Sequence, residues 1–247
     1  MSLIKTRSQA QSLPRALWAL GAVVSALLRH SRGRGFKSLS AHMRVIYEDE
    51  NLQVLDKPAG IDVDNIPRRV HRLDKDTSGI LLVAKNDEVL EFFQRQFKER
   101  RIKKKYLCLV VGNLKNKEGE IKNLLGRSPK DRRKQKVFLP QEPGALGKRE
   151  AITEYKVLER FKNYDLIEVE PQTGRKHQIR THLAYLGHPV AGDKLYGFKG
   201  QTCPPGLKRQ FLHASYLKIQ LPNKKIKEFK SELPNDLKLC LQSLKPL

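Results

Sequence analysis

Apolar residues form two kinds of pattern along this chain. Short apolar runs, or alternations of apolar and polar positions, are typical of strands and occur at residues 45–47, 52–58, 79–85, 104–112, 151–160, 164–171 and 211–222. Turn-like residues 48–51 separate the first two segments, so we expect these two strands to meet at a turn. The centre of 104–112 is apolar without interruption, which predicts a buried strand with Cys108 as a small core residue.

Two further segments have helical spacing. Residues 87–100 place Val89, Leu90, Phe93 and Phe97 on one face, and Asn86 is the expected N-cap. Residues 176–187 place Ile179, Leu183 and Leu186 inward, and Gly187 is expected to cap the end of that helix. Residues 43–247 show no repeat and no Pro- or Gly-rich linker, so the pattern predicts a single α+β domain.

Residues 1–42 differ from the rest of the chain. They hold no acidic residue and seven basic ones: Lys5, Arg7, Arg15, Arg29, Arg32, Arg34 and Lys37. Their apolar stretch, 16–28, is too short to cross a bilayer comfortably. Three interpretations stay open: an organellar transit peptide, a secretory signal, or sequence upstream of a true start at Met43. We treat 1–42 as a basic N-terminal extension.

The charge of the chain indicates a polyanionic partner. Its 247 residues include 49 Lys and Arg against 26 Asp and Glu, and the net charge of +23 becomes +16 when the seven basic residues of 1–42 are removed. Such a field favours nucleic acid first and an anionic membrane surface second. A basic enzyme of metabolites, or a solubilising lysine face, is the alternative. The three cysteines are widely spaced without a CxxC pair, which indicates a reducing compartment rather than disulfides or a zinc finger.

Three segments carry polar side chains that packing does not explain. HRLDKDTSG (71–79) concentrates polar residues directly before an apolar strand, which is typical of a functional loop, with a solvated turn as the alternative. TGRKHQIRTHL (173–183) places arginine at a helix start, against the macrodipole, which indicates an anionic partner. Its two histidines, His177 and His182, are five residues apart and share no face, so we expect no metal site.

The third segment is basic. It runs from Arg95 to Lys105 and continues with Arg127, Lys130, Arg132, Arg133, Lys134 and Lys136. Arginines and lysines interleaved with Phe97 and Tyr106 can bind phosphates and stack on unpaired bases. A solvated lysine face is the alternative, although it explains the arginines less well.

Together these segments resemble the RluA-type family of pseudouridine synthases from about residue 44 to 235. The resemblance rests on motifs in the family's order: LDKPAG (55–60), HRLDKDTSGILLVAK (71–85), KKYLCLVVG (104–112), GRSPKDRRKQKV (126–137), TGRKHQIRTHLAYLGHPVAGDKLYG (173–197) and LHA (212–214). It implies a single catalytic domain, 43–247, with a central, mainly antiparallel mixed β-sheet flanked by helices and loops. It also implies an isomerase that converts specific uridines in ribosomal or transfer RNA to pseudouridine.

The resemblance assigns roles to individual residues. Asp74 corresponds to the catalytic aspartate, acting as nucleophile or base, Arg180 to the arginine paired with it, and Tyr106 to the active-site tyrosine packed against the target base. Arg72 corresponds to a side chain that holds or replaces the flipped nucleotide, and Leu212 lines the uracil pocket. We add His71, Arg175 and His177 as substrate-binding residues, and Arg132, Arg133 and Lys134 as RNA-binding residues.

The implied reaction has no redox change, so neither a cofactor nor a metal is expected. We expect a monomer without an obligate protein partner or a membrane, acting in the cytoplasm, or in mitochondria or another organelle if 1–42 is a transit peptide. Two features depart from the family: only 61–70 separate Gly60 from His71, and no additional N-terminal RNA-binding domain is visible. A non-catalytic RNA-binding or ribosome-assembly factor with the same fold is the rival interpretation.

Overall fold

The fold is built on one large β-sheet. In the computed structural model the described residues are 43–247, so the expected N-terminal extension lies outside them. The strands are β1 (Arg44–Glu48), β2 (Leu52–Lys57), β3 (Ser78–Ala84), β4 (Lys103–Val111), β5 (Glu118–Arg127), β6 (Gln135–Phe138), β7 (Arg149–Phe161), β8 (Tyr164–Pro171), β9 (Leu212–Gln220) and β10 (Ile226–Lys230). The helices are α3 (Asp87–Lys98), α4 (Gln178–Tyr185) and α5 (Asn235–Gln242).

The sheet is mixed but mainly antiparallel. Its 10 strands follow the order β1-β2-β3-β9-β4-β8-β7-β5-β6, and β10 pairs with β9. Each pair is antiparallel except β3 with β9, which run parallel where Ser78 and Gly79 meet His213 and Ala214. This arrangement confirms the α+β domain expected from the sequence.

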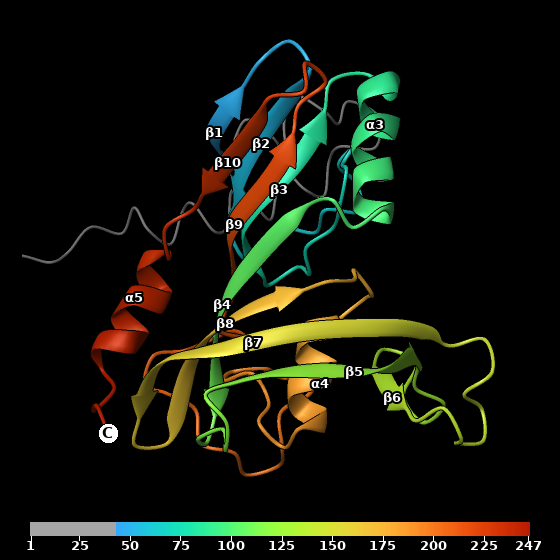
Figure 1. Ribbon diagram of the computed structural model, residues 1–247. Helices are drawn as coiled ribbons and strands as arrows, with labels where there is room; N and C mark the ends of the chain where they lie inside the picture. Colours follow the sequence, from blue (N-terminus) through green and yellow to red (C-terminus); the bar gives the residue numbers. More distant parts are fainter. Residues whose placement is uncertain (1–42) are drawn as a thin grey trace, which may run out of the picture.

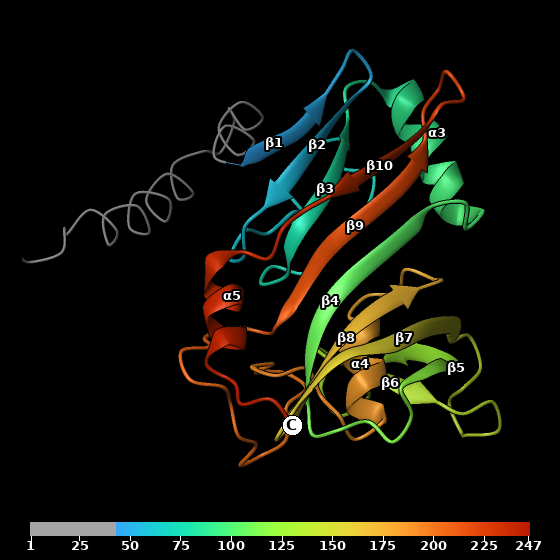
Figure 2. The same ribbon diagram turned by 60° about the vertical axis from the view of Figure 1, so that its left-hand side comes forward.

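The molecule has two halves that share the central strands β4 and β9. One half holds β1, β2, β3, β10 and α3, and the other holds β5, β6, β7, β8 and α4 (Figure 1). The views in Figures 1 and 2 both show β4 beside β9 between these halves, in agreement with their pairing. Each half has its own apolar core, one between α3 and the sheet and the other between α4 and β4 and β8.

Helix α3 begins where the sequence predicts and ends two residues before the expected end, at Lys98. The Asn86 side chain accepts a hydrogen bond of 2.9 Å from the backbone N–H of Val89, which satisfies one free donor of the first turn. Acidic residues in the first turn and basic residues in the last turn both suit the helix dipole. Val89 and Phe93 are buried against the sheet, so the predicted apolar face is confirmed.

Strand β3 fixes the position of the polar loop that precedes it. All seven of its residues are buried, which confirms the expected core strand. Gly79 has a φ of +110° and lies so close to the backbone of Ala214 in β9 that any Cβ would collide with it. Residues 71–77 therefore enter the sheet at one defined place, where the start of β3 pairs with β9.

Some expectations about the elements were wrong or incomplete. Leu186 was expected to point inward but is 37% exposed, because it is the C-cap of α4 and lies beyond the helical face that packs. Gly187 follows it with a φ of +86°, so this glycine lies one position after the cap. Strands β5, β6 and β10 and helix α5 were not predicted. None of the helices within residues 43–247 has the length and apolar character needed to cross a membrane.

Candidate active site

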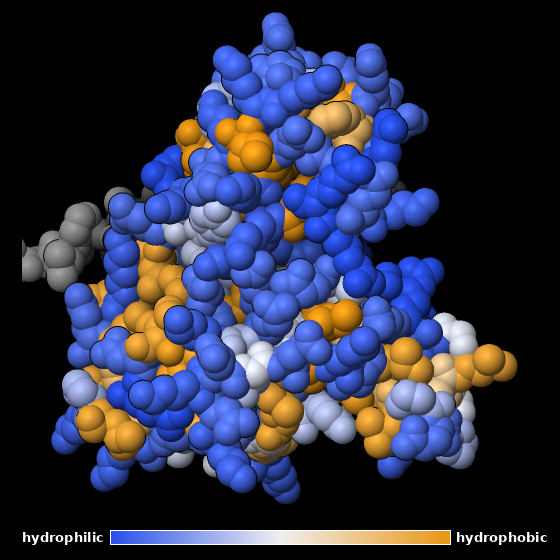
Figure 3. Space-filling view, in the orientation of Figure 1, coloured by the Kyte–Doolittle hydropathy of each residue, from blue (hydrophilic) through white to orange (hydrophobic). Residues whose placement is uncertain are grey.

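A deep cleft lies between the two halves. It has a volume of about 1160 Å³, and residues 64–74 form one wall, residues 173–180 form the other, and β4 and β9 form the floor. Hydrophilic residues cover much of the molecular face around the indentation between the halves (Figure 3). Eight residues singled out from the sequence line this cleft: Asp74, Arg180, Tyr106, Arg72, Leu212, His71, Arg175 and His177.

A buried lysine holds the loop that carries Asp74. The Lys57 side chain is fully buried at the end of β2, and its Nζ donates hydrogen bonds of 2.9, 3.0 and 2.9 Å to the carbonyl oxygens of Pro58, Ile61 and Lys75. Burial lowers the pKa of Lys57 to about 8. Because Lys75 directly follows Asp74, this amine fixes the backbone beside the predicted catalytic carboxylate.

The other end of the same loop is tied to the C-terminal part of the chain. Arg209 donates to the carbonyl oxygen of Asp76 at 3.1 Å and to the Ser78 hydroxyl at 3.2 Å, and its Nε lies 2.7 Å from Asp236 of α5. Gln210 donates to the Thr77 hydroxyl at 2.9 Å. Residues 74–78 are thus held from both sides, which gives the Asp74 side chain a preorganised position.

The guanidinium group of Arg180 joins two carboxylates. Its Nη1 donates to Asp74 Oδ2 at 2.8 Å, as the resemblance implies, and its Nε and Nη2 donate to Asp193 at 2.6 and 2.8 Å. The Asp193 carboxylate is fully buried and also accepts the backbone N–H groups of Leu195 and Tyr196. Burial alone would raise the pKa of Asp193, but the hydrogen bonds from Arg180 hold it below its usual value. Both carboxylates raise the pKa of Arg180 against the effect of burial.

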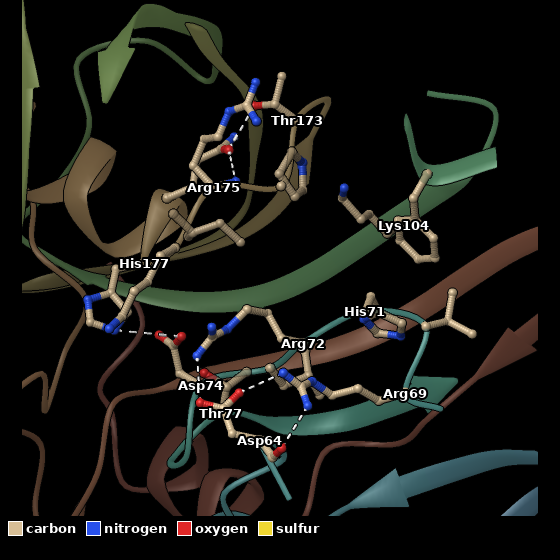
Figure 4. A pocket seen from close by; sticks show the side chains of 18 of the residues that line it. Asp64, Arg69, His71, Arg72, Asp74, Thr77, Lys104, Thr173, Arg175 and His177 are labelled. Carbon is tan, nitrogen blue, oxygen red and sulfur yellow. Dashed lines mark hydrogen bonds and ion pairs between the residues drawn. The ribbon is translucent and has the colours of Figure 1, made fainter. Parts of the chain in front are cut away.

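His177 faces the second oxygen of Asp74. Its Nε2 lies 3.8 Å from Asp74 Oδ1 (Figure 4). Its Nδ1 lies 2.9 Å from the Tyr196 hydroxyl. Burial lowers the pKa of His177 to about 4, although the charge of Asp74 opposes this, so the ring is neutral at neutral pH. His177 has a φ of +54°, a conformation that is costly for a residue with a Cβ and is often found at functional sites.

Tyr106 and Leu212 form the apolar floor beside Asp74. Tyr106 lies on β4 and packs, partly buried, between the core of the β8 half and the core beneath residues 61–73. Burial, and then the negative charge of Asp74, raise the pKa of the Tyr106 hydroxyl well above its usual value. Leu212 is buried at the start of β9, and its backbone pairs with Cys108. A flat base can therefore lie against an apolar surface while its sugar approaches the carboxylate.

The side chains of the remaining cleft residues differ in how strongly their contacts hold them in place. Arg72 is 43% exposed and lies 3.5 Å from Asp64, so it can reorient toward a ligand. His71 accepts the backbone N–H of Leu82 at 3.1 Å and stacks on Phe97, so it supports the wall of the cleft. Arg175 donates to the carbonyl oxygen of Glu150 at 3.0 Å, which directs part of its guanidinium group toward β7.

The predicted RNA-binding residues do not line the cleft. Arg132, Arg133 and Lys134 lie in the turn between β5 and β6, in the half that holds α4. Arg132 and Arg133 are both exposed, and the Arg133 side chain makes two hydrogen bonds to Asp131, of 3.0 and 2.9 Å. They can add positive charge near a bound RNA, but they are separate from the site around Asp74.

Sequence reasoning gave no role to three residues that shape the site, namely Lys57, Asp193 and Arg209, and it noted Lys104 only as part of the basic run from Arg95 to Lys105. All four lie in or next to motifs or basic runs noted in the sequence, so a signal existed but their contacts were not visible. His182 is buried and lies 2.9 Å from the Thr153 hydroxyl, away from His177. Within residues 43–247, no group of His, Cys, Asp and Glu side chains is arranged to hold a metal ion.

Comparisons with known proteins identify the family of this chain. A family profile described as RNA pseudouridylate synthase matches residues 56–185. Ribosomal large subunit pseudouridine synthase D of Borreliella burgdorferi is 36% identical over 230 residues, which cover 81% of this chain and 68% of that protein. The protein of the same name from Nitrosomonas europaea is 36% identical over 238 residues, which cover 83% of this chain and 66% of that protein.

A solved structure shows the same architecture. Human RNA pseudouridylate synthase domain containing 1 superposes with a TM-score of 0.72 at 28% identity, over 83% of this chain and 89% of that one. The chain spans about two thirds of the length of the two bacterial relatives. The profile covers more than half of the chain and includes both Asp74 and Arg180. This chain belongs to the RluA-type family of RNA pseudouridine synthases.

Proposed function

We propose that this protein isomerises specific uridines within RNA to pseudouridine, with Asp74 as the essential carboxylate. The observation that carries the proposal is the placement of Asp74. Its side chain is 16% exposed, lies in the cleft, and is held at 2.8 Å by an arginine that a second carboxylate fixes. A carboxylate kept reactive, oriented and largely shielded from water suits a reaction at a sugar carbon.

The reaction requires three events at one nucleotide. The bond between C1′ and N1 of the uracil breaks, the uracil rotates, and a bond forms between C1′ and C5. C5 then loses its proton and N1 takes one up, so that the product is an isomer of uridine. Asp74 acts as the nucleophile at C1′ or as a base toward the sugar. Tyr106 and Leu212 hold the detached uracil against the floor of the cleft, so that it rotates without leaving.

The cleft suits a segment of RNA more than a free nucleoside. Its volume of about 1160 Å³ exceeds the roughly 300–1,000 Å³ of ordinary small-molecule pockets. Eight basic side chains line it: Arg68, Arg69, Arg72, Lys98, Lys104, Arg175, Lys176 and Arg180. An enzyme that acts on a base in RNA must take that base out of its stack, and a basic surface around the cleft offsets this cost through phosphate contacts. We propose structured RNA as the substrate, ribosomal RNA first because of the relatives' names, and transfer RNA as the alternative.

The test compares total RNA from cells that carry and cells that lack the gene, with pseudouridine mapped at nucleotide resolution. At least one site should be lost in the deletion and restored by the wild-type gene, but not by Asp74→Asn. This substitution keeps the shape of the side chain and removes its charge and nucleophilicity. On purified RNA the variant should form no detectable pseudouridine, yet bind with an affinity within about threefold of the wild type, because binding rests on many phosphate contacts.

Two outcomes would overturn the proposal. If Asp74→Asn still converts uridine, Asp74 is not the catalyst. If the wild type and the variant bind the same RNAs but neither changes any uridine, a non-catalytic RNA-binding protein becomes the better interpretation. The retained binding of the variant separates these outcomes from simple unfolding.

A further inference from the structure

Lys104 differs from the two lysines beside it on β4. Lys103 pairs with Glu170 at 3.1 Å and Lys105 pairs with Glu168 at 2.7 Å, so both are neutralised by carboxylates of β8. Side chains alternate between the two faces of a strand, so Lys104 lies on the opposite face, where it lines the cleft. Among the ion pairs within residues 43–247, none involves Lys104.

The amino group of Lys104 reaches between the two walls of the cleft. Its Nζ lies 5.6 Å from the centre of the Phe97 ring of α3, which stacks on His71 in the wall formed by residues 64–74. A Cβ placed on Gly174, in the opposite wall, would lie 3.8 Å from the same atom. Figure 4 shows the side chain extending toward the opening between the two walls. The absence of a side chain at position 174 leaves room beside the amine for a ligand.

The surroundings of Lys104 contain no negative charge that balances it. Burial lowers the pKa of Lys104 to about 8, and no acidic group raises it. The carboxylates that line the same cleft are Asp64 and Asp74, and neither of them shifts the pKa of Lys104. The other titratable groups of the cleft are His71, Tyr106, His177 and the basic side chains of Arg68, Arg69, Arg72, Lys98, Arg175, Lys176 and Arg180. His71 is neutral because burial, and then Lys104 itself, lower its pKa to about 3. A cation held in partly desolvated surroundings without a counterion is unfavourable, and an anionic ligand removes that cost.

The position of Lys104 relative to Tyr106 identifies the kind of anion. Lys104 and Tyr106 are two residues apart on β4, which corresponds to about 7 Å along the strand. The side chain of Lys104 therefore begins next to the place where Tyr106 would hold the target uracil. We propose that Lys104 binds a backbone phosphate of the RNA directly adjacent to the flipped uridine. Lysine binds phosphate as a point charge, and the open position at Gly174 admits the phosphodiester. This subsite rests on the proposed function, because Tyr106 marks the base only if the cleft takes RNA.

The test uses a fluorescent decauridylate as probe and measures its dissociation constant by anisotropy at several salt concentrations. Lys104→Met should weaken binding about tenfold and lower the slope of log Kd against log salt by about 0.7, the value for one phosphate contact on a single strand. Lys103→Met is the matched control, since it removes a lysine of the same strand that is already paired. The dissociation constant of Lys103→Met should stay within about twofold of the wild-type value, and its salt slope should match that of the wild type.

A pH series distinguishes a phosphate contact from a structural role. Wild-type affinity should fall as pH rises from 7 to 9, because the Lys104 amine loses its proton near pH 8. Lys104→Arg stays charged over this range and should bind as well as the wild type at pH 7 without this fall. His71, Lys57 and the other lysines of the cleft are the same in both proteins, so the difference isolates residue 104. This comparison remains decisive even if Lys104→Met folds poorly.

The outcomes separate this subsite from the proposed activity. If Lys104→Met binds decauridylate with the wild-type affinity and salt slope, or if Lys104→Arg shows the same pH dependence as the wild type, the subsite is refuted. Either result could occur in a protein that still forms pseudouridine. If the wild type modifies no RNA but Lys104→Met lowers the slope as expected, the proposed activity fails and the phosphate subsite stands.

Discussion

Arg180 is fixed more firmly by Asp193 than by Asp74. Two of its nitrogens donate to Asp193, at 2.6 and 2.8 Å, and only Nη1 remains for Asp74. Asp193 itself accepts two backbone N–H groups, from Leu195 and Tyr196, which fix its carboxylate. Asp193 therefore sets the plane of the guanidinium group, and through it the orientation of the predicted catalytic carboxylate.

The first prediction concerns Asp193. Asp193→Asn should lower kcat by about 10–100-fold while RNA affinity changes less than about threefold, since a displacement of about 1 Å at the reacting group can cost a hundredfold. It should also lower the free energy of unfolding by about 3–5 kcal/mol, because Arg180 loses a buried partner. Single-turnover kinetics and urea unfolding measure the two effects. Asp76→Asn, an exposed change in the Asp74 loop, is the control, and an equal loss in both variants would argue against the positioning role.

The second prediction concerns pairs of substitutions. Arg180→Met leaves Asp193, which is fully buried, and Asp74, which is 16% exposed, without their partner. Adding Asp193→Asn to Arg180→Met should therefore restore more of the free energy of unfolding than adding Asp74→Asn, by about 1–2 kcal/mol, because a fully buried charge is costlier to leave unpaired. Urea unfolding of the four proteins measures this. Equal recovery in the two double variants would mean that Asp193 is less desolvated than its burial indicates.

The third prediction concerns acid stability. His182 is fully buried, its Nε2 has no hydrogen-bond partner within residues 43–247, and burial lowers its pKa to about 4. Between pH 6.5 and pH 4, the unfolded chain, with a histidine pKa of about 6.5, therefore binds a proton at this residue that the folded chain does not bind. The contribution of neutral His182 to the free energy of unfolding is fully present above pH 6.5. It is lost as the pH falls toward 4, at up to about 1.4 kcal/mol per pH unit.

His182→Gln removes this titration and keeps a polar group beside Thr153. The loss of stability between pH 6.5 and pH 4 should be smaller in this variant by about 2–3 kcal/mol, as urea unfolding at each pH can measure. His71 and His177, whose pKa values burial also lowers, titrate in both proteins and cancel in the difference. A wild-type pH dependence in the variant would mean that His182 is not held neutral in the folded state.

The sequence was sufficient to predict that Asp74 and Arg180 pair with each other, because the motifs around both residues match their family closely. It was not sufficient to show what fixes them. Lys57 stands beside a proline at the end of a strand, a place where lysine is usually solvated, and it is fully buried only because residues 58–75 wrap around it. Asp193 follows a glycine and precedes a lysine, as in a surface turn, and its role depends on how that turn folds back against α4.

The strands that were missed have weak signals. In β5 the buried positions Ile121, Asn123 and Leu125 do alternate with less buried ones, but a polar asparagine occupies the middle position. Its backbone pairs with β7 over eight residues, so partners distant in the sequence, rather than apolar content, stabilise it. Leu186 shows the opposite error: its helical spacing is correct, but the helix ends before its side chain can reach the core.

The fourth prediction concerns the turn between β5 and β6. Replacing Arg132, Arg133 and Lys134 with Ala should lower the salt slope of RNA binding by about 1–2, which is less than three full contacts, because Arg133 is already paired with Asp131. The single-turnover rate on bound RNA should stay within about twofold. Lys224→Ala with Lys225→Ala, in the turn between β9 and β10 of the other half, is the control. An unchanged slope in the triple variant would place the RNA elsewhere.

The last prediction concerns the hydroxyl of Tyr106. Tyr106→Phe keeps the ring that packs between the two cores but removes the O–H group, whose pKa is raised by burial and by Asp74. The hydroxyl therefore stays protonated through the neutral range and can donate a hydrogen bond or a proton to the sugar or the uracil. If it does so, the single-turnover rate should fall by about a hundredfold or more, the usual contribution of a positioned acid or base. RNA affinity should remain within about twofold, since the stacking surface is kept. Tyr155→Phe, which removes a hydroxyl from a ring packed on the same core outside the cleft, should lose almost no rate. A Tyr106→Phe protein with full activity would show that the ring alone matters, and that proton transfer during the isomerisation belongs to Asp74.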